Sequence, residues 1–417
     1  MRLTELEVKG FRGFTDETLK LDSRLTVLVG ANGSGKSSLL DALSMLLTQY
    51  SARIIGARSS AGRLKETDIR IGCDEARIRL RLTDERVGEV RWTLLKQGSR
   101  QRVLKPLGSD LTGLNGYVRA VAERTEGETW LQGEVLPIYY DQSRVVLKIP
   151  KRHRASKSDY SAVSAFRDSI GFWGINFPAL TSWFQDRETD ELRRQRSDRR
   201  YIDRDLDAVR RAMTTATGLS NPYFNVDRPR GLTFEKRKTA LHVSQLSTGE
   251  QVYLALAGDL ARRLAAVAPK GTDPLQGRAV VLIDELELHL HPKWQRAIAP
   301  WLLKTFPQCQ FIVSTHSPQV LSEVEASHVR ILEDTPKGAR IAVARWTKGR
   351  DSNHLLASVF DTPERKASAE RLLRLADKAI SEGELVKAGE LIADIEGAIE
   401  GSPPEAAVLR SRLARRA

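Results

Sequence analysis

The chain has 417 residues, of which 41% are hydrophobic and 29% are charged, so it can bury a large core in two or three lobes. Its two cysteines are too few for a disulfide framework, no apolar run is long enough to span a membrane, and no signal-peptide pattern follows Met1. These features exclude a transporter permease, and we expect a cytoplasmic protein with no membrane partner, whose formal charge of +13 favours polyanionic partners.

The first motif is a glycine-rich loop between a predicted strand and a predicted helix. An apolar run at residues 25–29 precedes a loop with the spacing G-x-x-x-x-G-K-S at residues 30–37, and a helical pattern follows to residue 47. Glycines let backbone N–H groups surround a triphosphate, the lysine adds a charge, and the serine hydroxyl can ligate Mg²⁺. The predicted nucleotide-binding residues are Asn32, Gly33, Ser34, Gly35, Lys36, Ser37 and Ser38.

The segment from residue 148 to residue 238 is strongly basic. It contains twenty Lys or Arg and twelve Asp or Glu, so eight of the thirteen net positive charges lie here. Its pattern is helical, with one long polar helix expected from about residue 180 to residue 216. Basic runs at residues 151–154, 193–196 and 199–200 could line a groove for phosphates, which predicts contact with DNA or another nucleic acid. The alternative is a solvated helix face of mixed charge.

The next motif is the hexapeptide L-S-T-G-E-Q at residues 246–251, followed by a helix-like run from residue 252 to residue 265. A small turn that contains glycine and opens a helix presents backbone N–H groups and the positive end of the helix dipole. Such a turn is an anion-binding terminus. Taken alone, this hexapeptide is an ordinary helix cap.

Two apolar runs end in polar residues that suit nucleotide hydrolysis. Residues 279–283 read as a buried parallel strand and are followed by Asp284 and Glu285. Because ligands bind at the carboxyl ends of such strands, Asp284 is expected to hold Mg²⁺ and Glu285 to polarise the attacking water. Residues 311–315 form a second apolar strand that ends at His316, where a γ-phosphate sensor is expected.

The order of these four motifs, between residues 25 and 316, resembles the ATP-binding-cassette ATPase heads of the SMC, RecF and OLD type. The resemblance implies Mg²⁺-dependent ATP hydrolysis by a head-to-tail homodimer or a higher homo-oligomer. ATP would lie between the phosphate loop of one head and the hexapeptide, called the signature, of the other. Glu285 and His316 would then be catalytic, Ser247 and Gly249 would act in trans, and Glu250 would be a further nucleotide-binding residue of the signature.

The same resemblance assigns two further residues. The segment G-F-R-G-F at residues 10–14 looks like the opening strand and turn of the family, which places Arg12 beside the nucleotide. The family also has a glutamine after a strand to sense Mg²⁺ and the water, and Gln142 fits because it follows an apolar run at residues 136–140. Gln49 and Gln132 are alternatives with poorer context. The predicted metal site is Ser37, Gln142 and Asp284.

The implied fold is an α/β ABC-ATPase head with a parallel sheet at the phosphate loop and an antiparallel β part, seen in the alternation of residues 76–82. Residues 1–145 would form the first half of the head, residues 146–240 an inserted helical lobe, and residues 241–350 the second half. Residues 351–417 would form a helical tail with a helix start at residues 362–364 and a break at Gly383. We expect residues 361–417 to hold the head in a larger oligomer or to dock a nuclease subunit, burying apolar side chains such as Leu391 and Ile395.

No intrinsic nuclease is expected, because only about 100 residues follow His316 and they lack an acidic cluster at a strand end. The overall resemblance is to stand-alone ATPases of bacterial anti-phage systems such as Septu and PARIS, which work with a separate nuclease. It implies an ATPase that couples its ATP state and DNA sensing to control of a nuclease. The alternative is a RecF-like repair or recombination ATPase without a toxic partner.

Overall fold

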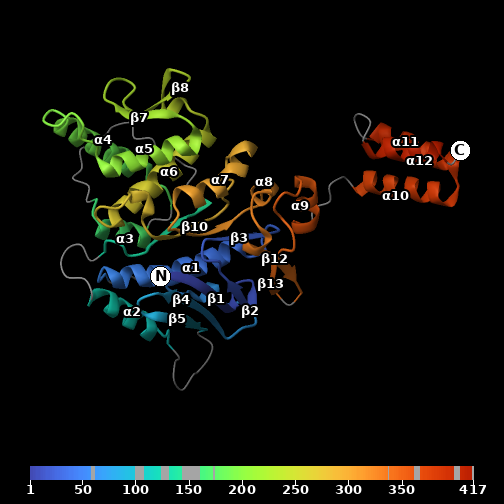
Figure 1. Cartoon of the computed structure of the whole chain (residues 1–417). Coiled ribbons are helices and arrows are strands. Elements are labelled where there is room, and N and C mark those ends of the chain that lie inside the picture. Colours follow the sequence, from blue (N-terminus) through green and yellow to red (C-terminus); the bar gives the residue numbers. More distant parts are fainter. Residues whose placement is uncertain are drawn as a thin grey trace. The chain divides into compact units, whose positions relative to one another are not determined.

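The structure is a computed structural model, and it describes residues 1–57, 62–98, 108–123, 131–142, 160–171, 174–336, 338–360, 367–398 and 404–415. The chain forms two compact units, Met1–Arg350 and Asp351–Ala417 (Figure 1). Every strand among the described residues lies in the first unit, and the described part of the second unit is helical.

A six-stranded sheet lies at the centre of the first unit, in the order β13-β12-β3-β11-β10-β6. All neighbouring strands are parallel except β12 and β13. Every residue of β3, β6, β10 and β11 is buried, as the continuous apolar runs in the sequence predict. The strands are β3 (Leu25–Gly30), β6 (Leu136–Tyr140), β10 (Ala279–Ile283), β11 (Gln310–Ser314), β12 (Val329–Thr335) and β13 (Gly338–Val343).

A four-stranded antiparallel sheet packs on the other side of the phosphate-loop helix, in the order β2-β1-β4-β5. The predicted alternation is confirmed in β4, where Ala76, Ile78, Leu80 and Leu82 are buried and the arginines between them are partly exposed. The strands are β1 (Arg2–Phe11), β2 (Phe14–Lys20), β4 (Glu75–Asp84) and β5 (Gly88–Gln97).

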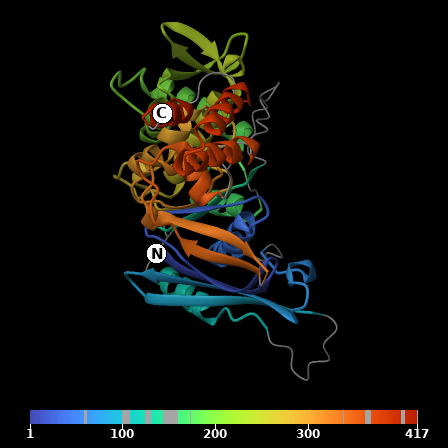
Figure 2. The same cartoon turned by 90° about the vertical axis from the view of Figure 1, so that its right-hand side faces the viewer.

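Helix α1 (Lys36–Ile54) lies between the two sheets and contacts β4 on one side and β3, β6, β10 and β11 on the other (Figures 1 and 2). Most of its residues are buried, including small polar ones such as Ser44, Thr48 and Ser51, because sheets cover it on both sides. The indole nitrogen of Trp92 in β5 donates to the Leu46 carbonyl oxygen at 3.3 Å. The helix that follows the phosphate loop is therefore held by both sheets.

The inserted segment differs from its prediction in two ways. The single long helix expected from residue 180 to residue 216 is wrong, because α4 (Phe177–Arg194) and α5 (Arg204–Thr217) are separate helices. The side chain of Asp203 caps α5 by accepting from the backbone N–H groups of Asp205 and Leu206. The segment is also not purely helical, since β7 (Ser220–Asn225), β8 (Gly231–Lys236) and β9 (Thr239–His242) form a three-stranded antiparallel sheet.

Helix α6 (Thr248–Val267) joins this segment to the central sheet and packs against α5, α4 and α3 (Ala162–Gly171). Figures 1 and 2 show α4, α5 and α6 on the side of the central sheet away from the antiparallel sheet. The other α-helices described in the first unit are α2 (Thr112–Ala122), α7 (Pro292–Thr305) and α8 (Pro318–Leu321). In the described part of the chain, no helix is both long enough and apolar enough to cross a membrane.

The second unit contains α9 (Ser352–Val359), α10 (Ala367–Glu382), α11 (Leu385–Ala398) and α12 (Pro404–Ala414). The predicted break at Gly383 is confirmed by its φ of +83° between α10 and α11, whereas the helix start at residues 362–364 lies outside the described residues. Helices α10, α11 and α12 bury a core of their own that includes Ile380, Ile392 and Ile395. Ile395 is fully buried in this core and so cannot contact a partner as predicted, whereas Leu391 is only partly buried against it, and docking of a partner by the tail stays a prediction.

Candidate nucleotide-binding site

The loop between β3 and α1 has the backbone geometry that its glycines allow. Gly30, Gly33 and Gly35 have backbone φ values of +150°, +81° and +101°, which residues other than glycine rarely adopt. A Cβ atom at Gly30 would lie 2.4 Å from the Leu332 carbonyl oxygen, and one at Gly35 would lie 2.6 Å from the Phe14 ring. The loop is therefore tightly curled, and it ends at Gly35, the N-cap residue of α1.

Lys36 and Ser34 place polar groups inside this loop. The ammonium of Lys36 donates to the carbonyl oxygens of Gly30 and Ala31 at 3.0 and 2.8 Å, and burial lowers its pKa. The Ser34 hydroxyl is buried and has no hydrogen-bond partner among the described residues. A buried donor without a partner fits an acceptor such as a phosphate oxygen.

Asp284 is the centre of the hydrogen bonds at the carboxyl ends of the strands. The hydroxyl of Ser37 donates to Asp284 Oδ2 at 2.8 Å, and the hydroxyl of Ser314 donates to Oδ1. The side-chain amide of Gln142 donates through Nε2 to Asp284 Oδ2 at 3.2 Å and to Glu285 Oε1 at 3.0 Å. Hydroxyl, amide and carboxylate oxygens form the hard donor set that Mg²⁺ prefers, so these residues fit the predicted metal.

The turn after β10 sets the direction of Glu285. Its φ is +51°, an unusual value for a residue other than glycine, and its backbone N–H donates to the Ser314 hydroxyl at 2.8 Å. Residues held in this way cluster at functional sites, where strain of about 1–3 kcal/mol is maintained by the surrounding structure. The turn therefore fixes the carboxylate beside Gln142.

His316 follows β11 and is held by Glu287, a residue that we did not predict from the sequence. The Glu287 carboxylate accepts from the Thr315 hydroxyl at 2.7 Å and from the His316 backbone N–H. Burial, and after it the charge of Lys36, lower the pKa of the His316 imidazole below its usual 6.5. Ser314 was also missed, and the only signal for either residue is its place next to a strand-end motif.

Ten of the fifteen predicted site residues line one pocket of about 200 Å³. They come from the phosphate loop and from the ends of β6, β10 and β11, which are parallel and so end at one edge of the sheet. The residues are Asn32, Gly33, Gly35, Lys36, Ser37, Ser38, Gln142, Asp284, Glu285 and His316. The arrangement places a cation, a hydroxyl and two carboxylates around one space.

Arg12 is not among the described residues that line this pocket. Its guanidinium donates to Asp68 at 3.0 Å and to Asp41 at 2.6 Å, and Asp41 lies on α1 one turn after Ser37. The ring of Phe11 also lies 5.1 Å from the guanidinium carbon. Arg12 therefore braces the start of α1, and its predicted contact with the nucleotide stays a prediction.

The signature residues also lie outside the pocket of their own chain. Ser247 caps α6, and Glu250 accepts from the Ser247 backbone N–H at 2.9 Å, so the two form a capping box. Glu250 also pairs with Lys236 at 2.7 Å. A Cβ atom at Gly249 would lie 2.6 Å from the His289 carbonyl oxygen, so the turn packs closely against the segment after β10.

Two family models match the chain. A model described as "AAA domain, putative AbiEii toxin, Type IV TA system" matches residues 143–322, and one described as "AAA domain" matches residues 5–207. The fold is similar to that of an SMC head crystallised with the C-terminal winged-helix domain of ScpA. That similarity covers 83% of this chain and 98% of the other, with a TM-score of 0.52 and 17% identity.

Named relatives agree with this assignment. A retron Ec83 probable ATPase of Escherichia coli is 26% identical over 88% of this chain and 77% of its own length. Septu protein PtuA of Bacillus mycoides (strain KBAB4) is 36% identical over 28% of this chain and 16% of its own length. RecF of Synechococcus sp. (strain JA-3-3Ab) is 31% identical over 46% of this chain and 53% of its own length. The chain is thus similar to AAA-family ATPases in sequence and to an SMC head in fold.

Proposed function

We propose that this ATPase hydrolyses ATP at the pocket beside Asp284, in a head-to-tail dimer, and that its ATP state controls an associated nuclease during anti-phage defence. One observation carries the proposal: six side chains with complementary roles, from four separate segments, meet at one edge of the central sheet. They are Lys36, Ser37, Gln142, Asp284, Glu285 and His316.

The roles of these residues follow from their chemistry. Ser37, Asp284 and Gln142 would hold Mg²⁺, which neutralises charge on the phosphates when it is bound. Lys36 would hold the outer phosphates, because its buried ammonium already points into the loop. Glu285 would orient and polarise the attacking water, since the Gln142 amide fixes one oxygen of its carboxylate.

The signature is proposed to complete the pocket of a second copy. Ser247, Gly249 and Glu250 lie outside the pocket of their own chain, at the N-terminus of the 20-residue helix α6. Backbone N–H groups at such a terminus attract anions. A neighbouring head that supplies this terminus would close the pocket over the γ-phosphate, which makes hydrolysis depend on dimerisation.

DNA is the proposed signal, and the turn between α4 and α5 is the proposed contact. Figure 1 shows this turn projecting from the inserted segment. The last turn of α4 and this connecting turn carry five exposed arginines, namely Arg193, Arg194, Arg196, Arg199 and Arg200. In the same stretch, only Asp190 and Asp198 are exposed acids, so the local charge is positive. The basic run at residues 151–154 lies outside the described residues.

The nuclease partner and the defence role rest on relatives. The names of the relatives include a retron ATPase and Septu PtuA, and the separate nuclease is what the sequence resemblance to anti-phage ATPases implies. The RecF similarity keeps repair or recombination as the second candidate. Purification of the ATPase from its native host separates the two, because only the first role requires a co-purifying nuclease.

The proposal is tested by two substitutions with different expected defects. Lys36→Ala should abolish ATP binding, whereas Glu285→Gln should keep ATP binding and lower kcat by about 100-fold or more, because only the water-activating group is lost. With ATP, light scattering of Glu285→Gln should give twice the mass of the 46.6 kDa chain. Glu89→Gln, at an exposed glutamate on β5, is the control. Normal turnover by Glu285→Gln would contradict the assignment.

A further inference from the structure

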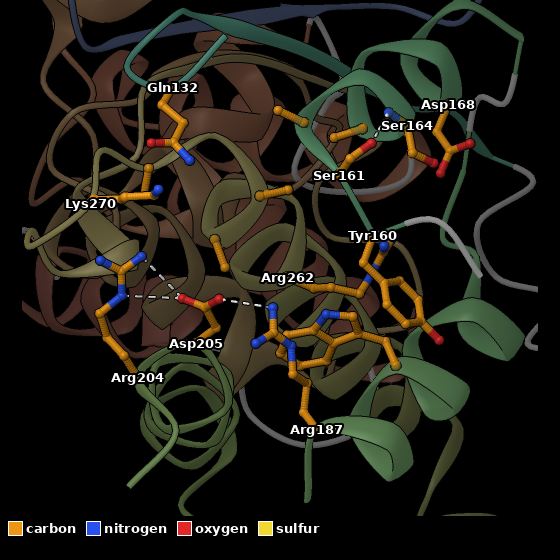
Figure 3. A pocket seen from close by; sticks show the side chains of 16 residues that line it. Gln132, Tyr160, Ser161, Ser164, Asp168, Arg187, Arg204, Asp205, Arg262 and Lys270 are labelled. Atoms are coloured by element: carbon orange, nitrogen blue, oxygen red, sulfur yellow. Dashed lines mark hydrogen bonds and ion pairs between the residues drawn. The ribbon is translucent and has the colours of Figure 1, made fainter. Parts of the chain in front are cut away.

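A second pocket, of about 340 Å³, lies in the first unit and shares no residue with the nucleotide pocket. Its walls come from α3, α4, the start of α5 and the end of α6 (Figure 3). Figure 3 shows Gln132 and Lys270 on one side of it and Tyr160, Ser161 and Ser164 on the other. A volume of this size is at the lower end of the range for small-molecule sites, about 300–1,000 Å³.

The charges around this pocket favour an anion. Four cationic side chains line it, namely Arg187, Arg204, Arg262 and Lys270, against two carboxylates, Asp168 and Asp205. Asp205 is already paired with Arg187 at 3.1 Å and with Arg204 at 3.2 Å. Lys270 is exposed and makes no hydrogen bond or ion pair with the residues that the structure describes. Arg187 also pairs with Asp203 and Arg262 with Asp259, so the positive charge without an acidic partner among the described residues is that of Lys270.

Arg262, which lines this pocket, has a hydrogen-bond donor without an acceptor. Arg262 is 9% exposed, and its Nη2 donates to Asp259 at 2.9 Å. Its Nε is buried and has no hydrogen-bond partner in the described part of the chain. A buried guanidinium N–H without an acceptor is unfavourable, and an anion in the pocket that accepts from it would remove that penalty.

We propose that this pocket binds the phosphate of a small phosphorylated molecule about as large as a mononucleotide. Guanidinium groups match phosphate oxygens in geometry and in charge. Gln132, Ser161 and Ser164 add polar groups, while Trp183 and the alanines of α6 supply an apolar wall. The site is separate from the ATPase pocket, so it stands whether or not the proposed function is correct.

The test uses inorganic pyrophosphate as the probe, because it carries the proposed chemistry and can be titrated by calorimetry. Lys36→Ala serves as the background, so that the phosphate loop lacks its cation. In this background, pyrophosphate should bind at one site per chain. Adding Arg262→Gln or Lys270→Ala should weaken binding by about tenfold, the factor that about 1.4 kcal/mol of lost charge-assisted hydrogen bonding gives. Adding Arg91→Ala, at an exposed arginine on β5, should change nothing.

Two results would overturn the proposal. One is the lack of any pyrophosphate binding to the Lys36→Ala protein. The other is binding that neither pocket substitution changes. Lys270 is exposed and unpaired within the described residues, so its variant folds even if Arg262→Gln, beside the buried Asp259, does not. If only Lys270→Ala is folded, that variant alone decides the outcome.

Discussion

Hydrogen bonds around Asp284 and Glu285 set the geometry of the site at the scale of single residues. Ser37, Ser314 and Gln142 all donate to the Asp284 carboxylate, and Gln142 also reaches Glu285. Each donor comes from a different segment, so the carboxylates are oriented before any ligand is bound. Pre-oriented groups lower the reorganisation that catalysis requires.

His316 gives a prediction about pH. Since burial and Lys36 lower its pKa below 6.5, the imidazole is neutral at pH 7 and becomes charged only on further acidification. The ATPase rate should therefore fall as pH decreases below 6.5. His316→Gln should lower kcat by about 100-fold at pH 7.5, and its kcat should no longer fall as pH decreases below 6.5. The measurement is kcat against pH for both proteins.

The same shift predicts the pH dependence of stability. The unfolded chain takes up a proton on His316 more readily than the folded chain, so its contribution to stability is present above pH 6.5 and is lost as pH falls. The melting temperature of the wild type should drop more on acidification than that of His316→Gln. An equal drop in both proteins would contradict this account of His316.

Residue-scale prediction from the sequence worked where a role is encoded locally. Lys36, Ser37, Asp284 and Glu285 stand in short motifs at strand ends, so their neighbours along the chain place them. Glu287 was missed because its role depends on Thr315 and His316, which are distant in sequence and near in space. The ion pairs of Arg12 were missed for the same reason.

Among whole elements, helix α6 connects the signature to strand β6. Asp259 in α6 is fully buried and accepts from Arg262, Arg263 and the hydroxyl of Tyr140, the last residue of β6. Tyr140 precedes Gln142 by two residues. The helix that begins at the signature is thus tied to the strand that positions Gln142.

Tyr140→Phe tests this connection. It removes one donor from a buried carboxylate, and we expect a loss of about 1–3 kcal/mol in the free energy of unfolding together with a lower kcat. Tyr253→Phe is a matched control, because the Tyr253 hydroxyl on α6 is buried without a partner among the described residues. The measurements are denaturant unfolding and ATPase rate. Equal behaviour of the two variants would contradict the connection.

Elements were less predictable from the sequence than single residues. The buried strands were found because their apolar runs are continuous. The separation of α4 from α5 was missed because the residues between them contain neither glycine nor proline, and the cap at Asp203 looks like part of a polar helix. The sheet of β7, β8 and β9 was missed because its strands are short and sit in a charged segment.

For the molecule as a whole, the proposed DNA contact predicts a salt dependence. Replacing Arg193, Arg194 and Arg196 with Ala should lower the slope of log affinity against log salt by up to about 2.7, because each lost phosphate contact removes about 0.9. Fluorescence anisotropy with a DNA duplex between about 50 and 200 mM salt measures this slope. Replacement of the exposed Arg340, Arg345 and Arg350 is the control. An unchanged slope would mean that the α4–α5 turn is a solvated surface.

The central claim is that each ATP site combines the phosphate loop of one head with the signature of another, and mixing two defective proteins tests it most directly. Lys36→Ala disables the loop, and Ser247→Arg, at an exposed residue, disables the signature, so each protein alone should be inactive. In a 1:1 mixture, half of the dimers are mixed and each has one complete site, so about a quarter of the wild-type turnover should return. A mixture as inactive as its parents, or an active Ser247→Arg protein, would contradict the claim.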